Sequence, residues 1–294
     1  MNKRIFPIIK TDSCLKKLVG FAMIYIFWYL IGIIMLVILT LSIKNEVMAM
    51  KCGQLAGSIC IFIITPITYQ LFFSNDIKND IGLGKISDWR IPILGVVAMY
   101  ASLPFINQLT IWNESISLPA ALEGVEEWMK MMENDAKETT EQMLSADNLG
   151  GLLFNILNIA IVPAIGEELT FRGVLQNIIV RHSRNAHIGV IVAAALFSAI
   201  HMQFYGFFPR MLLGIIMGYF YYYSRNIWVP ILMHCVNNGT VTVLKYLNNK
   251  NITEIDLESF GIMTNPIAIA LSAIAIVFAI VITSRIQQNK STEN

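Results

Sequence analysis

The 294-residue chain is 55% hydrophobic and only 14% charged, whereas a soluble domain carries about 25% charged residues. Its net charge of +1 gives no reason to expect a nucleic-acid partner. Apolar runs of about 20 residues recur along the sequence, and each is long enough to cross roughly 30 Å of hydrocarbon as a helix. The composition therefore predicts an all-α, polytopic membrane helix bundle rather than the pair of soluble domains that the length alone would allow.

About eight apolar stretches are predicted to cross the bilayer as helices. They comprise residues 18–43, 52–73, 91–112, 149–180, 188–203, 209–223, 227–247 and 266–286. The first is longer than the core of a signal peptide, so we expect a membrane span there and not a cleaved signal. The fourth is long for one crossing. We expect one long or tilted helix that projects into the cytoplasm, with a break near Gly166 as the alternative.

Basic residues are concentrated in alternate connections between these stretches. They occur near the N-terminus, around Lys78 and Arg90, around Arg181, at Arg225 and at the C-terminal end. With eight spans, all of these positions lie on one side, and the acidic connections 113–148 and 248–260 lie on the other. The positive-inside rule then predicts a multi-pass protein with cytoplasmic termini.

The connection 113–148 has a helical pattern of its own. Its apolar residues recur at spacings of four and three: Leu118, Leu122, Val125, Met129, Met132 and Ala136. This spacing places them on one helical stripe, and Ser117 and Pro119 are predicted as the cap and the first turn. We expect an amphipathic helix that lies on the membrane or over the bundle, with a lid over the substrate as the sharper alternative.

Charged side chains are concentrated within one predicted membrane helix, where they are costly and usually mark function. Glu168 and Arg172 are four residues apart, so they share a helix face and are expected to form an ion pair. Glu167 lies about 100° round the helix and is less directly paired, which suits a general base or acid. A purely structural ion pair would explain Glu168 and Arg172. It would not explain Glu167, because burying a second carboxylate beside the pair adds a further desolvation penalty and no stabilising partner.

Two further polar signals follow in separate apolar stretches. His201 ends the segment that begins at Phe197, and a lone histidine in an apolar helix is more often a satisfied core residue than a catalyst. His234 and Asn238 are four residues apart, so they point the same way and need polar partners. Hydrogen bonds between helices are the alternative to a functional site.

The three signals are predicted to lie at similar depth in the membrane. Counted from the nearest basic connection, Glu168 lies 13 residues deep, His201 lies 14 and His234 lies 9. At about 1.5 Å per residue, these counts correspond to roughly 20 Å for the first two and about 13–14 Å for the third. Unrelated packing contacts would have no reason to match in depth. We therefore expect one polar cavity that opens to the cytoplasm.

Together the motifs resemble those of the CPBP intramembrane proteases, which include the Ras-converting CAAX prenyl endopeptidases and bacterial relatives linked to bacteriocin processing and immunity. The motifs are Glu167-Glu168-x-x-x-Arg172, Phe197-x-x-x-His201 and His234-x-x-x-Asn238, in this order on separate apolar stretches. The resemblance covers roughly residues 150–245 and is specific because all three motifs are present.

The resemblance implies an intramembrane endopeptidase with a defined role for each matching residue. Glu167 would activate a water, and His201 would position that water or exchange its proton. His234 and Asn238 would donate hydrogen bonds to the developing oxyanion, while Glu168 and Arg172 would support the site. This division fits peptide hydrolysis, which needs a base beside a water and donors aimed at the oxyanion.

Metal dependence is left open by the sequence. The family has been described both as metalloproteases and as glutamate-dependent hydrolases. A zinc ion would be held by Glu167, His201 and His234, with a water in the fourth position. The sequence lacks the HExxH signature of helical zinc sites, so we expect catalysis that requires no cofactor, with zinc as the alternative.

The sequence predicts three regions. Residues 1–148 hold N-terminal spans and the amphipathic connection, residues 149–247 form the catalytic helical core, and residues 248–294 hold a connection and the last span. The expected partners are the lipid bilayer and a membrane-associated peptide or protein substrate, either a prenylated CaaX peptide or a leader peptide. A proton-coupled transporter and a non-catalytic immunity or scaffold protein are the alternatives, since intramembrane acids and histidines also build proton relays.

Overall fold

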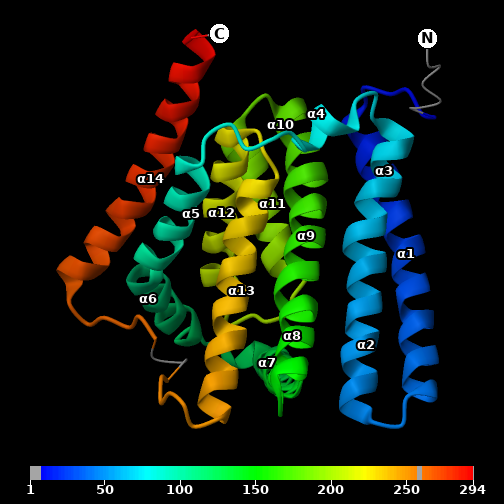
Figure 1. Cartoon of the computed structure of the whole chain (residues 1–294), viewed down its shortest axis with the longest axis vertical. Helices are drawn as coiled ribbons and strands as arrows, with labels where there is room; N and C mark the ends of the chain where they lie inside the picture. Colours follow the sequence, from blue (N-terminus) through cyan, green and yellow to red (C-terminus); the bar gives the residue numbers. More distant parts are fainter. Residues whose placement is uncertain (1–7, 257–259, 294) are drawn as a thin grey trace.

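The chain forms a bundle of helices that run back and forth between two ends of the molecule (Figure 1). The computed structural model describes residues 8–256 and 260–293, and every regular element within these ranges is helical. The predicted all-α class is therefore confirmed for the described residues. Residues 257–259, part of the predicted acidic connection 248–260, lie outside them.

The N-terminal half contains seven α-helices, a π-helical segment and a short 3-10 turn. These are α1 (Cys14–Ser42), α2 (Glu46–Ser58), η1 (Ile59–Ile64), α3 (Thr65–Phe73), α4 (Ile77–Ile81), α5 (Arg90–Ala101), α6 (Leu103–Glu114), η2 (Ala120–Leu122) and α7 (Glu123–Leu144). The C-terminal half contains α8 (Leu149–Asn155), η3 (Ile156–Ile161), α9 (Val162–Glu168), η4 (Leu169–Gln176), α10 (Asn177–Ser183), α11 (Ala186–Ala199), α12 (Phe207–Ser224), α13 (Trp228–Asn249) and α14 (Pro266–Glu293). The segments η3 and η4 are π-helical.

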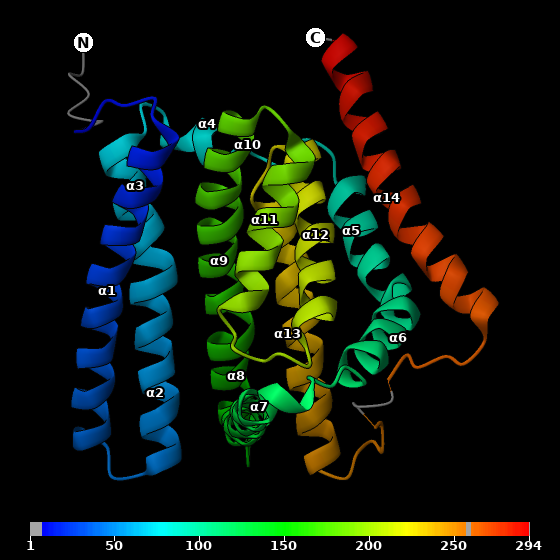
Figure 2. The same ribbon diagram turned by 180° about the vertical axis from the view of Figure 1, so that it is seen from behind.

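Helices α1 and α2 form a hairpin at one edge of the bundle (Figures 1 and 2). Each begins at a capping side chain: Ser13 accepts from the Lys16 N–H, and Asn45 accepts from the Met48 N–H. The segment η1 of this hairpin contacts α9. The hairpin thus covers one side of the long helix that runs from α8 to α10, and α11, α12 and α13 lie on the other side.

Two apolar clusters join the helices of the bundle. One is formed by α5, α12, α13 and α14, with Ile91, Phe220 and Met233 at its centre. The other joins the hairpin to η4 and α11 through residues that include Phe21 and Phe171. Because lipid tails are as apolar as these side chains, close packing and interhelical hydrogen bonds hold such helices together, rather than exclusion of water.

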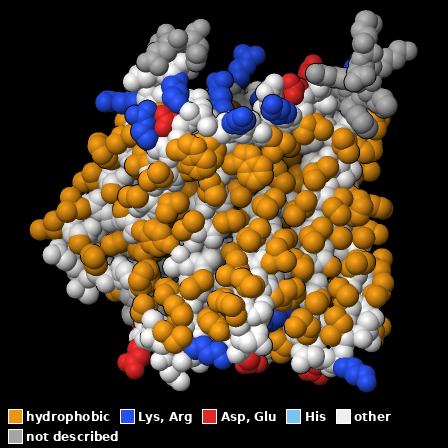
Figure 3. Space-filling model, in the orientation of Figure 1, with side chains coloured by type: hydrophobic (Ala, Val, Ile, Leu, Met, Phe, Trp, Pro, Cys, Tyr) orange, Lys and Arg blue, Asp and Glu red, His pale blue; other side chains and the backbone are white. Residues whose placement is uncertain are grey.

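A broad belt of hydrophobic side chains surrounds the molecule between its two ends (Figure 3). Large apolar residues such as Met23, Leu30 and Phe278 are more than half exposed. A soluble monomer rarely exposes a contiguous apolar patch larger than a few hundred Å². Lys and Arg side chains gather at the end that carries α4 and α10. The belt is the surface expected of an integral membrane protein, in which lipid covers the apolar side chains.

Four helices among the described residues are long and apolar enough to cross a membrane, or five if one bent pair counts as a single span. The four are Cys14–Ser42, Glu46–Phe73, Leu149–Ser183 and Pro266–Lys290. The prediction of about eight spans is therefore confirmed only in part. Helix α11 has only 14 residues. Helices α12 and α13 are long enough to cross a membrane, but polar residues lower their mean hydropathy. These residues are Arg210 and a run of tyrosines in α12, and His234 and several asparagines in α13.

Two of the predicted stretches show how the chain crosses the bundle. Residues 91–112 form α5 and α6, which meet at an angle of 46° around Ser102, so the predicted span is present as a bent pair of helices. Pro104 follows directly, and its ring does not fit a continued helix. By contrast, α8 to α10 form one continuous helix of 35 residues. Gly166 lies inside α9, so the alternative of a break at that glycine is wrong.

The predicted amphipathic helix is present as α7, at the end of the bundle opposite to the chain termini (Figure 2). Its Met129, Met132 and Ala136 are partly buried, as the stripe predicts. The helix begins at Glu123 and has no side-chain cap, so the predicted start at Ser117 and Pro119 is wrong. The proline instead begins a separate 3-10 turn, which interrupts the helical pattern.

A small ion cluster ties the C-terminal helix to the start of α5. Asp88 accepts from Arg90 and lies 3.3 Å from Lys290 Nζ of α14. Hydrogen bonds from Arg90 hold the pKa of the Asp88 carboxyl well below its usual range. The ionised form is therefore favoured in the folded state, and the resulting stability is present above about pH 4 and is lost as pH falls towards the folded pKa.

Asp88→Asn is therefore expected to lower the Tm in detergent at pH 7 by about 2 °C or less, because the contacts are largely exposed. The difference from the wild type should shrink as the pH falls below about 4. Thermal unfolding at several pH values measures this, with Asp12→Asn as the control. A Tm difference that stays constant down to pH 3 would contradict the assignment.

Candidate active site

The long helix that contains α9 carries the glutamate pair where it touches the N-terminal hairpin. Gly166 precedes Glu167, and a Cβ atom added to Gly166 would lie 2.6 Å from Cβ of Phe62 in η1. Since Cβ atoms do not approach so closely, this packing requires glycine. The π-helical segment η4 begins immediately after Glu168, and π-helical turns often occur at functional sites.

Glu168 forms the centre of a buried polar network. Its Oε1 accepts hydrogen bonds from Arg172 Nη1 at 2.8 Å and from His234 Nδ1 at 2.9 Å. The Glu168 side chain is 0% exposed and that of Arg172 is 1% exposed. Arg172 also donates to the Gly214 carbonyl at 3.0 Å and lies 4.9 Å from the centre of the Phe197 ring. The predicted ion pair is thus present, and it contacts α11, α12 and α13 at once.

Glu167 lies beside this network and is the less paired of the two carboxylates. Its Oε2 is 3.8 Å from His234 Nε2, which is longer than a hydrogen bond. Because His234 Nδ1 donates to Glu168, the opposite nitrogen of the ring faces Glu167. The Glu167 side chain is 12% exposed, so it borders open space rather than close-packed protein.

His201 lies in the turn after α11, not within a helix. Helix α11 ends at Ala199, and Met202 has a left-handed φ of 54°, so the prediction of one helix over residues 188–203 is wrong at its C-terminal end. Nδ1 of His201 donates to the Phe197 carbonyl at 2.8 Å. In the neutral ring this leaves Nε2 as a hydrogen-bond acceptor.

Asn238 is held against the backbone of η3. Its Nδ2 donates to the Ile159 carbonyl at 3.1 Å, and its Oδ1 accepts from Asn237 Nδ2 at 3.1 Å. A side-chain amide carries two N–H groups, so Asn238 has a second donor beyond the one that Ile159 accepts. The position of this amide is therefore fixed by backbone that belongs to the same long helix as Glu167.

One cavity of about 320 Å³ brings four of the predicted residues together. Its lining includes Glu167 from α9, His201 from the turn after α11, and His234 and Asn238 from α13. Glu168 and Arg172 do not line it but support its wall from behind. The structure therefore brings these residues into one site, as the sequence predicts, while their chemical roles stay predictions.

The cavity also contains polar residues that the sequence analysis did not select. Arg210, in the first turn of α12, and Asn237 of α13 both line it. Arg210 is a charged residue in a stretch predicted to cross the membrane, so the argument that selected Glu167 would also have selected it. For Asn237 the sequence offers no signal beyond its place beside Asn238.

Helix α7 contacts the loop that borders this cavity. Glu133 accepts from the Tyr205 N–H at 3.2 Å and from Gln203 Nε2 at 3.4 Å. Trp128 packs on Phe204 with 5.2 Å between the ring centres. These contacts place the amphipathic helix beside the cavity, at the end of the bundle opposite to the basic residues, so the predicted opening to the cytoplasm is not confirmed. Movement of α7 as a lid stays a prediction.

The remaining polar residues of the long helix serve helix packing. Asn155 accepts from Lys51 Nζ at 2.9 Å, and Asn158 Nδ2 donates to the Lys51 carbonyl at 3.0 Å. Neither asparagine lines the cavity described above. Both asparagines therefore join the long helix to α2.

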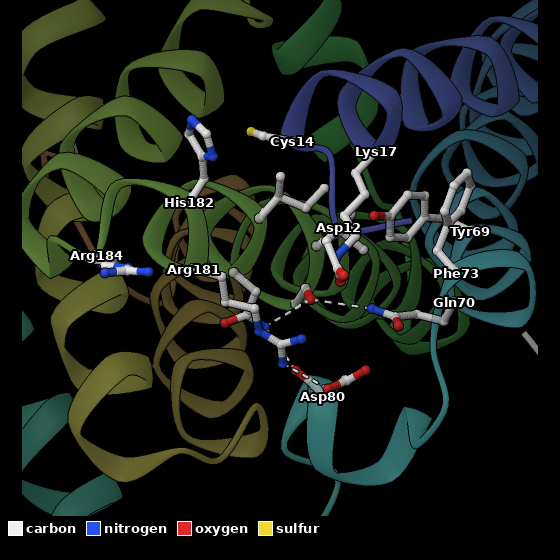
Figure 4. Close-up of a pocket in the computed structure, with 14 residues that line it drawn as sticks. Asp12, Cys14, Lys17, Tyr69, Gln70, Phe73, Asp80, Arg181, His182 and Arg184 are labelled. Carbon is white, nitrogen blue, oxygen red and sulfur yellow. Dashed lines mark hydrogen bonds and ion pairs between the residues drawn. The ribbon is translucent and has the colours of Figure 1, made fainter. Parts of the chain in front are cut away.

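A second and larger cavity, of about 430 Å³, lies at the basic end of the molecule (Figure 4). Lys17, Arg181 and Arg184 line it together with the acidic Asp12 and Asp80. Arg181 donates to Asp80 at 2.7 Å. None of the predicted catalytic residues borders this cavity. The positive-inside rule already accounts for basic residues at this end.

Glu167, His201 and His234 are the side chains that could bind a metal ion in this cavity. The described residues contain no group of three or more His, Cys, Asp and Glu side chains arranged to hold a metal. Nδ1 of His201 is held by the Phe197 carbonyl and Nδ1 of His234 by Glu168, which leaves Nε2 of each ring, and Nε2 of His234 lies 3.8 Å from Glu167. A zinc ion held by Glu167, His201 and His234 therefore stays an alternative prediction.

Residues 149–240 match a family model described as type II CAAX prenyl endopeptidase, Rce1-like. This segment is similar to the Rce1-like family, and the match covers less than half of the chain. The Rce1-like segment lies within the predicted catalytic region 149–247, and it contains Glu167, His201, His234 and Asn238. The resemblance to intramembrane CAAX proteases inferred from the motifs is therefore confirmed, and the match supports an endopeptidase.

An uncharacterized Bacillus subtilis protein, YpbD, is also similar to this chain. The two are 24% identical over 170 residues, which cover 56% of this chain and 75% of YpbD. No solved structure matches the chain. The Rce1-like segment contains every predicted catalytic residue, whereas the hairpin of α1 and α2 lies outside it.

Proposed function

We propose that this protein is an intramembrane endopeptidase that hydrolyses a peptide bond of a membrane-associated substrate, with Glu167 activating the attacking water. The observation that carries the proposal is the cavity in which Glu167, His201, His234 and Asn238 meet. A peptidase needs a base beside a water and donors towards the carbonyl oxygen that becomes negative. The Rce1-like segment supports this reaction because its family is a protease family.

Glu167 takes the role of general base in the proposed reaction. Its carboxylate removes a proton from water as the oxygen attacks the carbonyl carbon, and the same carboxyl group then gives a proton to the leaving amine. His201 supports the water through Nε2, because its Nδ1 is held by the Phe197 carbonyl. Glu167 comes from α9 and His201 from the turn after α11, so they can contact one water from two sides.

His234 and Asn238 take the role of oxyanion donors. Asn238 offers the amide N–H that Ile159 does not accept. His234 donates from Nε2 when both ring nitrogens carry protons, and the bond from Nδ1 to Glu168 fixes the ring in the required orientation. Removing one such donor in other acyl-transfer enzymes lowers kcat by about 10²–10³.

We propose that catalysis requires no metal, and that the water is activated by Glu167 alone. A zinc chelator should then leave the hydrolysis rate within about twofold of the untreated rate. Loss of activity with EDTA, restored by zinc, would contradict this part of the proposal.

We also propose that α11, α12 and α13 cross the bilayer with the helices that qualify as spans, because they lie among them. This gives the eight crossings predicted from the sequence and places both termini on the side that carries the basic residues, which is the cytoplasm under the positive-inside rule. The substrate classes that fit are a prenylated CaaX peptide and a leader peptide in the plasma membrane of a bacterium.

The proposal is tested by hydrolysis of a mixed library of prenylated and unprenylated membrane-anchored peptides by the detergent-purified protein. The wild type should cleave members of the library. His201→Ala should lower kcat by about 10²–10³, because the water loses one of its two partners. His187→Ala is the matched control, since His187 contacts Tyr219 outside the cavity, and it should cleave at the wild-type rate. Equal rates for wild type and His201→Ala would contradict the assignment.

The same assay separates the proposal from its alternatives. A transporter or a non-catalytic scaffold would cleave no peptide, whichever variant is used. Cleavage by a contaminant would persist in His201→Ala. Only a peptidase with its site in this cavity loses activity with the cavity histidine and keeps it with the control.

A further inference from the structure

The cavity at the basic end lies between two groups of helices that are far apart in the sequence (Figure 4). Lys17 of α1 and Tyr69 of α3 line it on the side of the N-terminal helices. Arg181 of α10 and Arg184, which follows α10, line it on the side of the long helix. Its volume of about 430 Å³ falls within the range of ligand pockets. The proposed peptidase reaction makes no use of it.

Basic side chains outnumber acidic ones around this cavity. The described lining residues include three basic and two acidic side chains, which leaves one positive charge: Lys17, Arg181, Arg184, Asp12 and Asp80. Arg181 donates to Asp80 at 2.7 Å, so these two neutralise each other. The side chains of Lys17 and Arg184 form no ion pair with a described residue. Two cationic groups from opposite walls are therefore available to an anion.

A buried hydroxyl group adds a neutral donor to these charges. Tyr69 is only 4% exposed, and its ring stacks on that of Phe73 with 4.8 Å between the centres. No described residue forms a hydrogen bond with its hydroxyl group. Unlike the hydroxyl of Tyr205, which is sealed inside the protein, that of Tyr69 keeps accessible surface, and it points to the side of the cavity where Lys17 and Asp12 lie (Figure 4). Buried polar groups are almost always hydrogen-bonded, so this donor calls for a partner inside the cavity.

The position of the cavity in the molecule favours a lipid as the source of the anion. It lies at the end that carries α10, where Lys and Arg side chains gather at the border of the hydrophobic belt (Figure 3). The positive-inside rule explains why basic residues occur at this end, but it does not explain why they surround a cavity between two groups of helices. Basic pockets between membrane helices on the cytoplasmic side typically bind anionic lipid headgroups.

We propose that this cavity binds the headgroup of an anionic phospholipid, whose phosphate contacts Lys17 from one wall, Arg184 from the other and the hydroxyl group of Tyr69. A lipid phosphodiester carries one negative charge, which matches the one positive charge that the lining leaves uncompensated. The carboxylate of Asp12 can accept hydrogen bonds from hydroxyl groups of the headgroup, which favours phosphatidylglycerol. The bound lipid joins the hairpin, which lies outside the Rce1-like segment, to the helix that carries Glu167.

The first test adds lipids to the wild-type protein in a neutral detergent and records the Tm, which does not depend on peptidase activity. Phosphatidylglycerol at saturating concentration should raise the Tm by about 3–6 °C, because a ligand stabilises the state that binds it. Phosphatidylcholine with the same acyl chains should raise it by less than about 1 °C, since its quaternary ammonium group repels the basic residues and donates no hydrogen bond. Glycerophosphoglycerol, the headgroup without acyl chains, should have no effect at the same concentration.

The second test uses variants that are matched in chemistry and position, with affinity taken from the lipid concentration that gives half of the Tm shift. Arg184→Gln should weaken the binding of phosphatidylglycerol about tenfold, because a hydrogen bond to a charged group is lost. Arg225→Gln is its control and should bind as the wild type does. Arg225 also follows a helix at the basic end and has a similar left-handed φ, 51° against 53° for Arg184, but it does not line the cavity.

A second matched pair tests the opposite wall. Lys17→Gln should weaken the binding of phosphatidylglycerol as much as Arg184→Gln does. Lys16→Gln changes the neighbouring lysine, which is exposed and does not line the cavity, and it should have no effect. Tyr69→Phe removes a single hydroxyl group and should weaken binding by a factor of about 2–10. This smaller change serves if Lys17→Gln or Arg184→Gln does not fold.

Three results would overturn the proposal. One is an equal Tm shift for phosphatidylglycerol and phosphatidylcholine in the wild type, which needs no variant. Another is a loss of affinity in Arg225→Gln or Lys16→Gln as large as in its matched partner, which would assign the effect to the overall charge of this end. The last is a shift with glycerophosphoglycerol as large as with the lipid, which would assign the cavity to a soluble phosphate.

Discussion

Glu167→Gln is expected to lower the kcat of peptide hydrolysis by about a thousandfold or more while the protein stays folded. Glutamine has the same shape but cannot accept a proton, and a positioned general base contributes about 10²–10⁴ to the rate. The variant keeps the buried network intact, because Glu168 and not Glu167 binds Arg172 and His234. The measurement is the hydrolysis rate of a membrane-anchored peptide, with the Tm recorded in parallel.

The control for this prediction is Glu138→Gln. Glu138 is exposed on α7, where it accepts from Gln142 within the same helix at 3.3 Å. This variant has the same chemical change and should cleave at the wild-type rate. If Glu167→Gln retained more than about a tenth of the wild-type kcat, Glu167 would not be the base, and Glu168 or a metal-bound water would have to replace it in the mechanism.

Arg172→Met is expected to lower the stability of the folded protein by about 3–5 kcal/mol. Removing one partner of a buried ion pair leaves the other charge without compensation, which is the costliest kind of single substitution at such a site. Glu168 would keep only His234 as a partner, and the Gly214 carbonyl would lose its donor. Unfolding of the detergent-solubilised protein by heat or by SDS in mixed micelles measures the change.

A double variant distinguishes the effect of the unpaired Glu168 charge on stability from the effect of lost side-chain packing. Glu168→Gln combined with Arg172→Met removes both charges, so it should recover most of the lost stability, since neutral replacement of a buried pair is often tolerated. Activity should stay low, because His234 would lose its carboxylate partner. If Arg172→Met alone cost less than about 1 kcal/mol, the pair would be solvated, and the buried network would not support the site.

The sequence predicted which residues meet in one cavity better than it predicted the ends and bends of the helices that carry them. The motif residues converge because each has to face the same cavity, and spacing along a helix encodes that orientation directly. The bend at Ser102 and the end of α11 at Ala199 depend on contacts with other helices. A hydropathy pattern contains no information about such contacts. The span count differs for another reason, since Arg210, the tyrosines of α12 and the asparagines of α13 lower the mean hydropathy of these two helices.

The motifs alone do not predict that Arg210 lines the cavity. Arg210 is a charged residue in an apolar stretch, but it belongs to none of the three motifs. Its place beside the cavity depends on the register of α12 against the long helix, which the hydrogen bonds from Arg172 to the Gly214 carbonyl and from Gln176 to the Gly218 carbonyl establish. Such a register between two parallel helices leaves no periodic signal in one sequence.

The most direct test of the central claim is hydrolysis in water enriched in ¹⁸O, followed by mass spectrometry of the newly formed C-terminus. The wild-type protein in proteoliposomes should place one labelled oxygen in the new carboxylate of a membrane-anchored peptide. Glu167→Gln should form no labelled product within the same time. Equal labelled product from both proteins, or no cleavage by folded wild-type protein across the peptide library, would contradict a hydrolytic site at Glu167.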